Sequence, residues 1–217
     1  MKKDNIQFIE IMDNVKSLED AVKHLERYGK VLIGDDIPLP SITVEETTKV
    51  TDQIWHQDGL QTENQPRIQA LWCEYADEEC PSTEYVSTRI PNNIAEKYLD
   101  IKETYDFKTP IESGNFVKFD KVSHAKLYVR QINNTPNLMK NLIDKDEWGY
   151  YTRWCPMSKV DESIAEELSD YIFQQEPLEI HYKTNRLVVG NNYATIHRRT
   201  PNKNISGKRI LHRAYVY

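Results

Sequence analysis

Two side chains in the sequence Trp55-His56-Gln57-Asp58-Gly59 have the chemistry of metal ligands. His56 and Asp58 are two positions apart, and on an extended strand such residues point to the same face. An imidazole and a carboxylate that converge there supply two ligands for a metal ion. The pair alone is weak evidence, because a strand-end histidine paired with a carboxylate gives the same pattern.

A second histidine far downstream, His197, could complete the ligand set. It follows an apolar segment and precedes a polar loop over residues 200–207. Two histidines and one carboxylate leave three coordination positions open, which is the arrangement of non-heme Fe(II) oxygenases. The sequence therefore predicts an iron site at His56, Asp58 and His197.

Two arginines near the end of the chain could bind an anion. If residues 208–217 form a strand, Arg209 and Arg213 share one face and His212 lies on the other. Burying two guanidinium groups is costly without anionic partners, and arginine is well suited to bidentate carboxylate recognition. The alternative is an edge strand on which both arginines face solvent. We expect His212 to pack rather than to bind metal.

The other segments must position these residues, and their patterns predict many short strands with a few helices. Apolar residues at helical spacing predict helices over residues 17–28 and 163–174, the first capped by Ser17. Shorter helices are expected over residues 92–99 and 135–142. Strands are expected over residues 30–33, 67–75, 83–87, 178–183, 186–189 and 208–217. Turn residues between short strands favour a barrel or jelly roll, mainly β with flanking helices.

Length and composition narrow the class of protein. A chain of 217 residues can bury one sizeable core, so we expect a single domain over residues 1–217. No apolar run approaches membrane-spanning length, and the first residues do not resemble a signal peptide. Three cysteines without a CxxC pair favour a reducing, cytoplasmic compartment. The net charge of −6 disfavours broad nucleic-acid binding.

Several motifs occur together in the order of one known family. Four of the matching stretches are Trp55-His56-Gln57-Asp58, residues 80–87 with Thr83, Asn191-Asn192 with His197, and Arg209-Ile210-Leu211-His212-Arg213. They resemble the Trp-His-x-Asp strand, the 2-oxoglutarate-contacting Thr, the Asp-Asn…His segment and the Arg-x-x-His-Arg strand of the taurine dioxygenase (TauD/TfdA) family. The resemblance is strongest over residues 55–88 and 162–215.

This resemblance implies an Fe(II)- and 2-oxoglutarate-dependent dioxygenase with a double-stranded β-helix (jelly roll, cupin-like) fold. Such an enzyme decarboxylates 2-oxoglutarate with O2, releasing succinate and CO2, and oxidises a C–H bond of its substrate. It also implies that His56, Asp58 and His197 hold the iron. Related halogenases have a small residue at the carboxylate position, so the presence of Asp58 favours hydroxylation or a related oxidation.

The same resemblance assigns the anion-binding residues. Arg209 would pair with the distal carboxylate of 2-oxoglutarate, with Thr83 hydrogen-bonding nearby. Arg213 would face the iron and bind either a substrate anion or the C1 carboxylate of 2-oxoglutarate.

The expected substrate is a small metabolite, such as an amino acid or another carboxylate or sulfonate. Candidate substrate contacts are Asp52, Tyr150, Trp154 and Arg213, and aromatic core packing is the alternative for at least one of Tyr150 and Trp154. Two other functions stay open: a nucleic-acid-directed oxygenase of the same superfamily, and a non-catalytic jelly-roll binding protein or cupin with another metal. The assembly state, including a homo-oligomer, also stays open.

Overall fold

The computed structural model describes residues 5–33, 42–45, 55–60, 65–105, 139–154, 158–200 and 207–217. For residues 42–45, 103–105 and 158–159 it describes the backbone alone. The candidate substrate contact Asp52 lies outside the described residues.

A six-stranded antiparallel sheet forms the larger layer. Five strands follow the order β1-β12-β4-β14-β2, and β3 also pairs with β14. The strands are β1 (Ile9–Met12), β2 (Val31–Ile33), β3 (Ile42–Glu45), β4 (Ile68–Ala76), β12 (Arg186–Asn191) and β14 (Arg209–Val216). Because β14 has β4 on one side and β2 and β3 on the other, the edge-strand alternative for its arginines is wrong.

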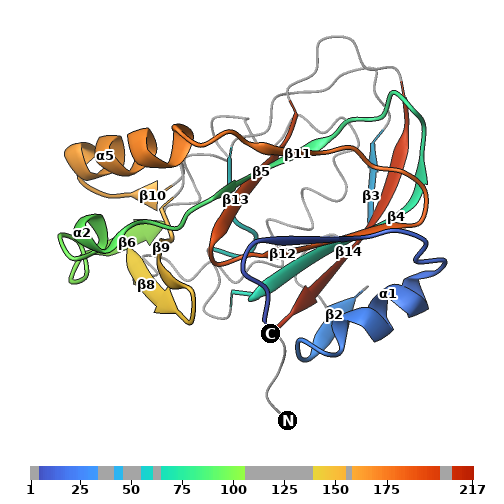
Figure 1. Ribbon diagram of the computed structural model, residues 1–217, viewed down its shortest axis with the longest axis horizontal. Helices are drawn as coiled ribbons and strands as arrows, with labels where there is room; N and C mark the ends of the chain where they lie inside the picture. The colour runs from blue at the N-terminus through green and yellow to red at the C-terminus, as the bar shows by residue number, and fades with distance from the viewer. Residues whose placement is uncertain are drawn as a thin grey trace.

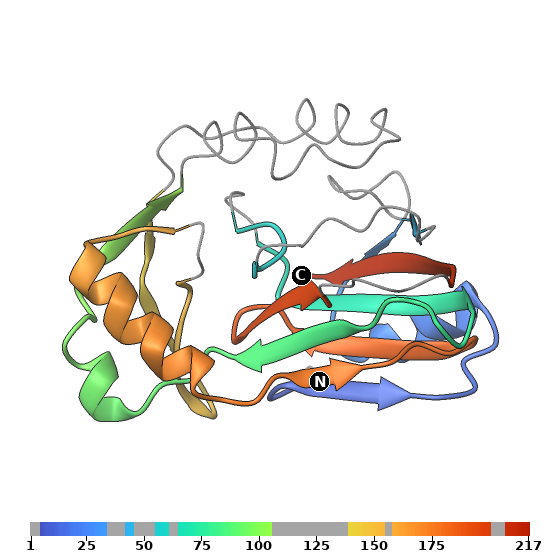
Figure 2. The same ribbon diagram turned by 90° about the horizontal axis from the view of Figure 1, so that it is seen from above.

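A second, three-stranded sheet has the order β11-β5-β13. Its strands are β5 (Thr83–Ser87), β11 (Leu178–Ile180) and β13 (Thr195–Arg199). Two small sheets contain the other strands of the described residues. One has the order β10-β6-β7, from β6 (Lys102–Tyr105), β7 (Met139–Asn141) and β10 (Ser158–Lys159), and the other is the hairpin of β8 (Ile143–Asp146) with β9 (Gly149–Thr152). Figure 2 shows β1, β12, β4 and β14 running side by side, with the helices α2 and α5 at the other end of the molecule.

The outer face of the large sheet is apolar and packs against the helix α1 (Leu18–Leu25). Ser17 begins this helix by accepting a hydrogen bond from the Asp20 backbone N–H at 3.1 Å, as its sequence predicts. Ala21 and Leu25 are buried among alternate residues of the strands. Those strand residues are Ile68, Ala70, Trp72, Leu187, Val189, Ala214 and Val216. The residues that alternate with these along the same strands therefore face the second sheet.

Side chains of both sheets meet in the space between them. Leu71 and Leu211 of the large sheet pack there with Tyr85 and Ile180 of the small sheet. On the far side of the small sheet, Leu168 and Ile172 of α5 (Glu162–Phe173) belong to another core cluster, which also contains residues of β5 and β13. Figure 1 shows α5 and the short α2 (Asn92–Ala95) at one end, and α1 beside β2 at the other.

One of the helices expected from the sequence is wrong. The helix expected over residues 135–142 is a strand where the structure describes it, since Met139–Asn141 pairs with Lys102–Thr104 of β6. This segment gains its main-chain partners from a distant strand, so local propensity does not decide its conformation. The helix expected over residues 92–99 is shorter, at Asn92–Ala95. None of the helices in the described ranges is long and apolar enough to span a membrane.

Candidate metal centre

His56, Asp58 and His197 converge between the two sheets. One donor atom from each residue can be chosen so that all three lie within 4.8 Å of one another. Asp58 Oδ1 lies 3.6 Å from His56 Nε2 and 4.0 Å from His197 Nε2. Asp58 and His197 are buried, at 6% and 4% exposure, and the two imidazole ring centres are 4.4 Å apart.

The backbone brings the two histidines together directly. The His56 N–H donates to the His197 carbonyl at 3.1 Å, and the His197 N–H donates to the His56 carbonyl at 2.9 Å. The expected strand ends at this bridge, because Asp58 begins a turn in which Gly59 has φ +67°. That left-handed conformation suits glycine. The convergence of His56 and Asp58 therefore depends on a bridge followed by a turn, and the extended strand predicted through Asp58 is wrong.

A buried asparagine holds the turn in place. The Asn192 side chain accepts from the Asp58 backbone N–H at 3.0 Å and donates to the Asp58 carbonyl at 2.8 Å. It also donates to the Pro66 carbonyl at 2.8 Å. Its neighbour Asn191 stabilises the loop that follows, because its side-chain oxygen accepts hydrogen bonds from the backbone N–H groups of Tyr193 and Ala194. One carboxamide thus fixes the backbone that carries the predicted carboxylate ligand.

The protonation states suit metal binding. Burial raises the pKa of Asp58, but the positive charge of Arg213 and the two imidazoles outweigh it, and the pKa falls to about 2. Burial and the neighbouring His56 lower the pKa of His197 to about 3. Near neutral pH the carboxylate is therefore ionised and the His197 ring is neutral, which are the forms that coordinate a metal. Two imidazoles and one carboxylate on one side of a buried site fit Fe(II) with open positions.

The sequence matches the family model described as "Taurine catabolism dioxygenase TauD, TfdA family" over residues 3–215. The chain belongs to this family. It is thus a dioxygenase that uses Fe(II), 2-oxoglutarate and O2. A search of curated proteins found no match.

Solved structures share the fold of this TauD-family chain. PvcB from Pseudomonas aeruginosa is 11% identical with a TM-score of 0.64, covering 96% of this chain and 75% of PvcB. AAD-2, solved with Mn(II) and N-oxalylglycine, is 14% identical with a TM-score of 0.68, covering 96% and 81%. A taurine dioxygenase from Burkholderia xenovorans is 13% identical with a TM-score of 0.65, covering 96% and 76%. The predicted jelly-roll fold is confirmed.

The two arginines of β14 lie on the inner face of this TauD-family fold. Arg209 is 2% exposed, and its Nη1 donates to the Pro81 carbonyl at 2.5 Å and to Thr83 Oγ1 at 3.3 Å. Its guanidinium also lies over the Tyr182 ring, 4.7 Å from the centroid. Arg213 Nε lies 3.9 Å from Asp58 Oδ2. Arg209 and Thr83 therefore lie together, and Arg213 lies beside the candidate metal ligands.

Sequence reasoning missed two residues at Asp58. Gln69 Nε2 donates to Asp58 Oδ2 at 2.6 Å and lies 3.2 Å from His197 Nε2. The Tyr215 hydroxyl donates to the same Oδ2 at 2.9 Å. Strand parity could have placed Tyr215 on the face of Arg209 and Arg213. The glutamine within the otherwise apolar run Ile68–Cys73 was a second available signal.

The two aromatic substrate candidates lie in or against the core. Trp154 is 5% exposed within the cluster that includes Leu168 and Ile172 of α5. Tyr150 packs against this cluster, and Lys145 Nζ lies 4.6 Å from the centre of its ring. The alternative of aromatic core packing therefore accounts for the position of Trp154.

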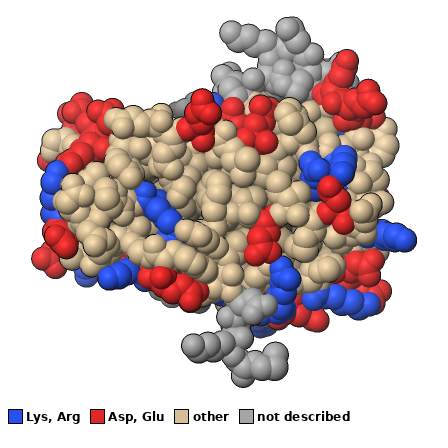
Figure 3. Space-filling view, viewed as in Figure 1, with Lys and Arg blue, Asp and Glu red and all other residues tan. Residues whose placement is uncertain are grey.

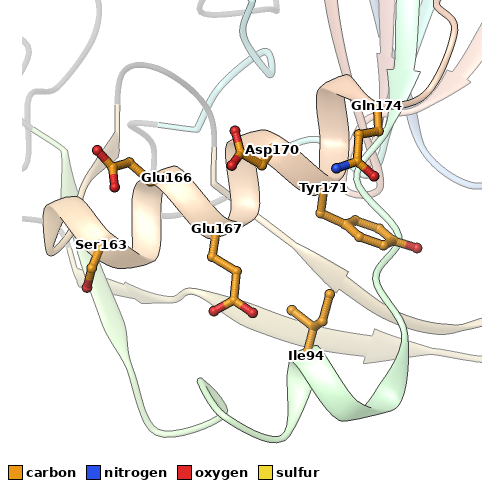
Figure 4. Close-up of a pocket in the computed structure, with 7 residues that line it drawn as sticks. All are labelled: Ile94, Ser163, Glu166, Glu167, Asp170, Tyr171 and Gln174. Carbon is orange, nitrogen blue, oxygen red and sulfur yellow. The ribbon is translucent and has the colours of Figure 1, made fainter.

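A surface hollow lies between α2 and α5 (Figure 4). It is lined by Ile94, Ser163, Glu166, Glu167, Asp170, Tyr171 and Gln174. Glu167 is engaged there by ion pairing with Lys97 and by a hydrogen bond from Tyr98. None of the lining residues is a predicted site residue, so the hollow is separate from the candidate metal centre.

Proposed function

We propose that His56, Asp58 and His197 hold the Fe(II) of this dioxygenase. The observation that carries the assignment is the convergence of their donor atoms within 4.8 Å at a buried position. Bound iron, with 2-oxoglutarate and O2, supplies the oxidising power for attack on an unactivated C–H bond. The protein contributes an ionised carboxylate, a neutral imidazole and a site walled by two sheets.

We propose that Arg209 and Thr83 bind the distal carboxylate of 2-oxoglutarate. The support is their mutual contact and the burial of both side chains on the inner face. A buried guanidinium strongly favours an anionic partner. Arg213, beside Asp58, is proposed to bind the C1 carboxylate of 2-oxoglutarate or an anionic group of the substrate.

The proposed substrate is a small carboxylate- or sulfonate-bearing metabolite, such as an amino acid, and the proposed reaction is hydroxylation or a related oxidation. The net charge of −6 supports this over a nucleic-acid substrate. On the face shown in Figure 3, acidic and basic side chains are interspersed rather than gathered into a basic stripe. We also propose that residues 1–217 form one domain, and that buried thiols at Cys73 and Cys80 suit a reducing cytoplasm.

Anaerobic titration with Fe(II) and 2-oxoglutarate tests the site without a known substrate. A bidentate 2-oxoacid on facially ligated iron gives a weak charge-transfer band at roughly 500 nm. We expect this band in the wild type, its loss in Asp58→Ala, and in Arg209→Ala a band that requires a higher 2-oxoglutarate concentration.

Two matched variants control for the substitutions. His212 lies on the outer face, with its ring 5.2 Å from that of Trp72, so His212→Ala should keep the band while His56→Ala loses it. Arg198 pairs with Glu84 at 2.6 Å, so Arg198→Ala should leave 2-oxoglutarate affinity unchanged. An unaltered band in His56→Ala would refute the metal assignment. Iron binding without any band would refute the 2-oxoglutarate assignment.

A further inference from the structure

The two oxygens of the Asp58 carboxylate have different surroundings. Oδ2 accepts hydrogen bonds from Gln69 Nε2 at 2.6 Å and from the Tyr215 hydroxyl at 2.9 Å. Oδ1 is the oxygen nearest to both imidazoles, 3.6 Å from His56 Nε2 and 4.0 Å from His197 Nε2. One oxygen is thus engaged by the protein, and the other points towards the two histidines.

The two donors are neighbours on adjacent strands. Gln69 of β4 and Tyr215 of β14 are directly paired in the sheet register, so their side chains share the inner face. They are 3% and 0% exposed. The residues on either side of Gln69, Ile68 and Ala70, face the apolar outer cluster. A glutamine at this place avoids the cost of a buried polar group because its amide has a carboxylate partner.

The donor distances indicate what these hydrogen bonds do. A carboxylate next to an imidazole would gain by direct hydrogen bonding, at about 2.7–2.9 Å. Both distances from Oδ1 to an imidazole nitrogen are longer than that. Donors at about 2.1 Å from one ion and at right angles are about 3 Å apart. The carboxylate is therefore held apart from the imidazoles, at 3.6 and 4.0 Å, which is wider than a hydrogen bond and also wider than this spacing of about 3 Å.

The orientation of the Gln69 amide follows from the same contacts. If the amide were turned over, its carbonyl oxygen would face the ionised Asp58 carboxylate and repel it. With the nitrogen towards Oδ2, the amide also lies 3.2 Å from His197 Nε2, so one side chain contacts two of the three candidate ligands.

We propose that Gln69 and Tyr215 are positioning residues that make Asp58 a one-oxygen ligand through Oδ1. By occupying Oδ2, they prevent the carboxylate from rotating to give both oxygens to the metal. Asp58 would then take one coordination position instead of two. The positions needed for 2-oxoglutarate and O2 would stay open. This inference rests on the proposed metal centre.

The test uses Mn(II) alone, with Gln69→Leu, Tyr215→Phe and the double variant. Mn(II) affinity is measured by electron paramagnetic resonance titration. Coordination is measured by infrared difference spectra of protein labelled with carbon-13 aspartate. The splitting between the two carboxylate stretches is wide for one-oxygen and narrow for two-oxygen binding. We expect a wide splitting in the wild type, and about 10-fold weaker affinity with a narrower splitting in each single variant.

The double variant separates a shared role from general damage. Because both groups donate to one oxygen, each single variant keeps one donor, and we expect the double loss to exceed the product of the two single losses. Gln65→Leu is the matched control, because Gln65 is also buried, at 4% exposure, but its amide donates to Gln57 Oε1 and the Asn192 carbonyl. It should leave the splitting wide. Tyr215→Phe is nearly isosteric and keeps the test informative if Gln69→Leu folds poorly.

Each alternative outcome has a defined meaning. A narrow splitting in the wild type, or wild-type affinity and splitting in all three variants, would overturn the inference while leaving the metal centre intact. A wild type that binds no Mn(II) and gives no band with Fe(II) and 2-oxoglutarate would overturn the proposed metal centre, and the inference with it.

Discussion

The two faces of β4 and β14 differ sharply although they belong to the same strands. The outer face carries Ile68, Ala70 and Val216 beneath α1. At the same end of the strands, the inner face carries Gln69 and Tyr215, both bound to Asp58. Successive side chains of a strand point to opposite faces. Adjacent residues can therefore stabilise the core on one face and position the carboxylate of Asp58 on the other.

Removal of a metal ligand should produce the largest effect on the inner face. His197→Ala is expected to weaken Fe(II) affinity by more than about 100-fold, since the loss of a direct ligand should exceed the 10–100-fold typical of supporting residues. Iron titration and 2-oxoglutarate turnover measure the loss. Thermal unfolding of the metal-free protein should change less than for the truncation of a core leucine beneath α1. A fall in melting temperature as large as that of Leu25→Ala would show that this end of the inner face contributes equally to stability.

The matching disruption of the outer face is Leu25→Ala. Leu25 is 0% exposed in the cluster beneath α1, so truncation should cost about 2–5 kcal/mol of unfolding free energy through lost contacts and a cavity. Denaturant unfolding measures that cost, and metal affinity at a temperature where the variant is folded should match the wild type. If Leu25→Ala weakened metal binding as much as His197→Ala, the division between the faces would be wrong.

Asn192 lies between these extremes, because it acts on the backbone of Asp58. Asn192→Ala removes three hydrogen bonds and leaves buried backbone groups unpaired, which should cost about 1–3 kcal/mol. We expect metal affinity to fall about 10-fold as the turn loosens. Denaturant unfolding and Mn(II) titration would be run together with Asn141→Ala, whose side chain is exposed and should affect neither.

The smallest effect should come from an ion pair far from the metal centre. Hydrogen bonds from Arg186 and Lys183 lower the pKa of Asp13 from 3.8 to about 2. A lowered folded-state pKa adds stability that is present above about pH 4 and is lost as the pH falls towards 2. Since these groups are partly exposed, Asp13→Asn should cost only about 0.5–1 kcal/mol at neutral pH. Denaturant unfolding measures the difference in unfolding free energy between the wild type and Asp13→Asn, which should be smaller at pH 2 than at pH 7. An equal difference at both pH values would contradict the charge mechanism.

The sequence alone determined the periodic parts of this protein. Alternation placed Arg209 and Arg213 on one face of β14 and His212 on the other, because side-chain direction in a strand depends on parity. The cap of α1 at Ser17 was likewise local chemistry. The types of the three candidate ligands were enough to suggest iron.

Only the tertiary structure decided which groups reach Asp58. Gln69 is 11 residues away in sequence and Tyr215 is 157 residues away, and no local pattern joins them to one carboxylate oxygen. The tertiary structure also placed Asp58 in a turn held by Asn192, and made Met139–Asn141 a strand. In each case the deciding hydrogen bonds come from distant parts of the chain, and such contacts exist only once the two sheets have assembled.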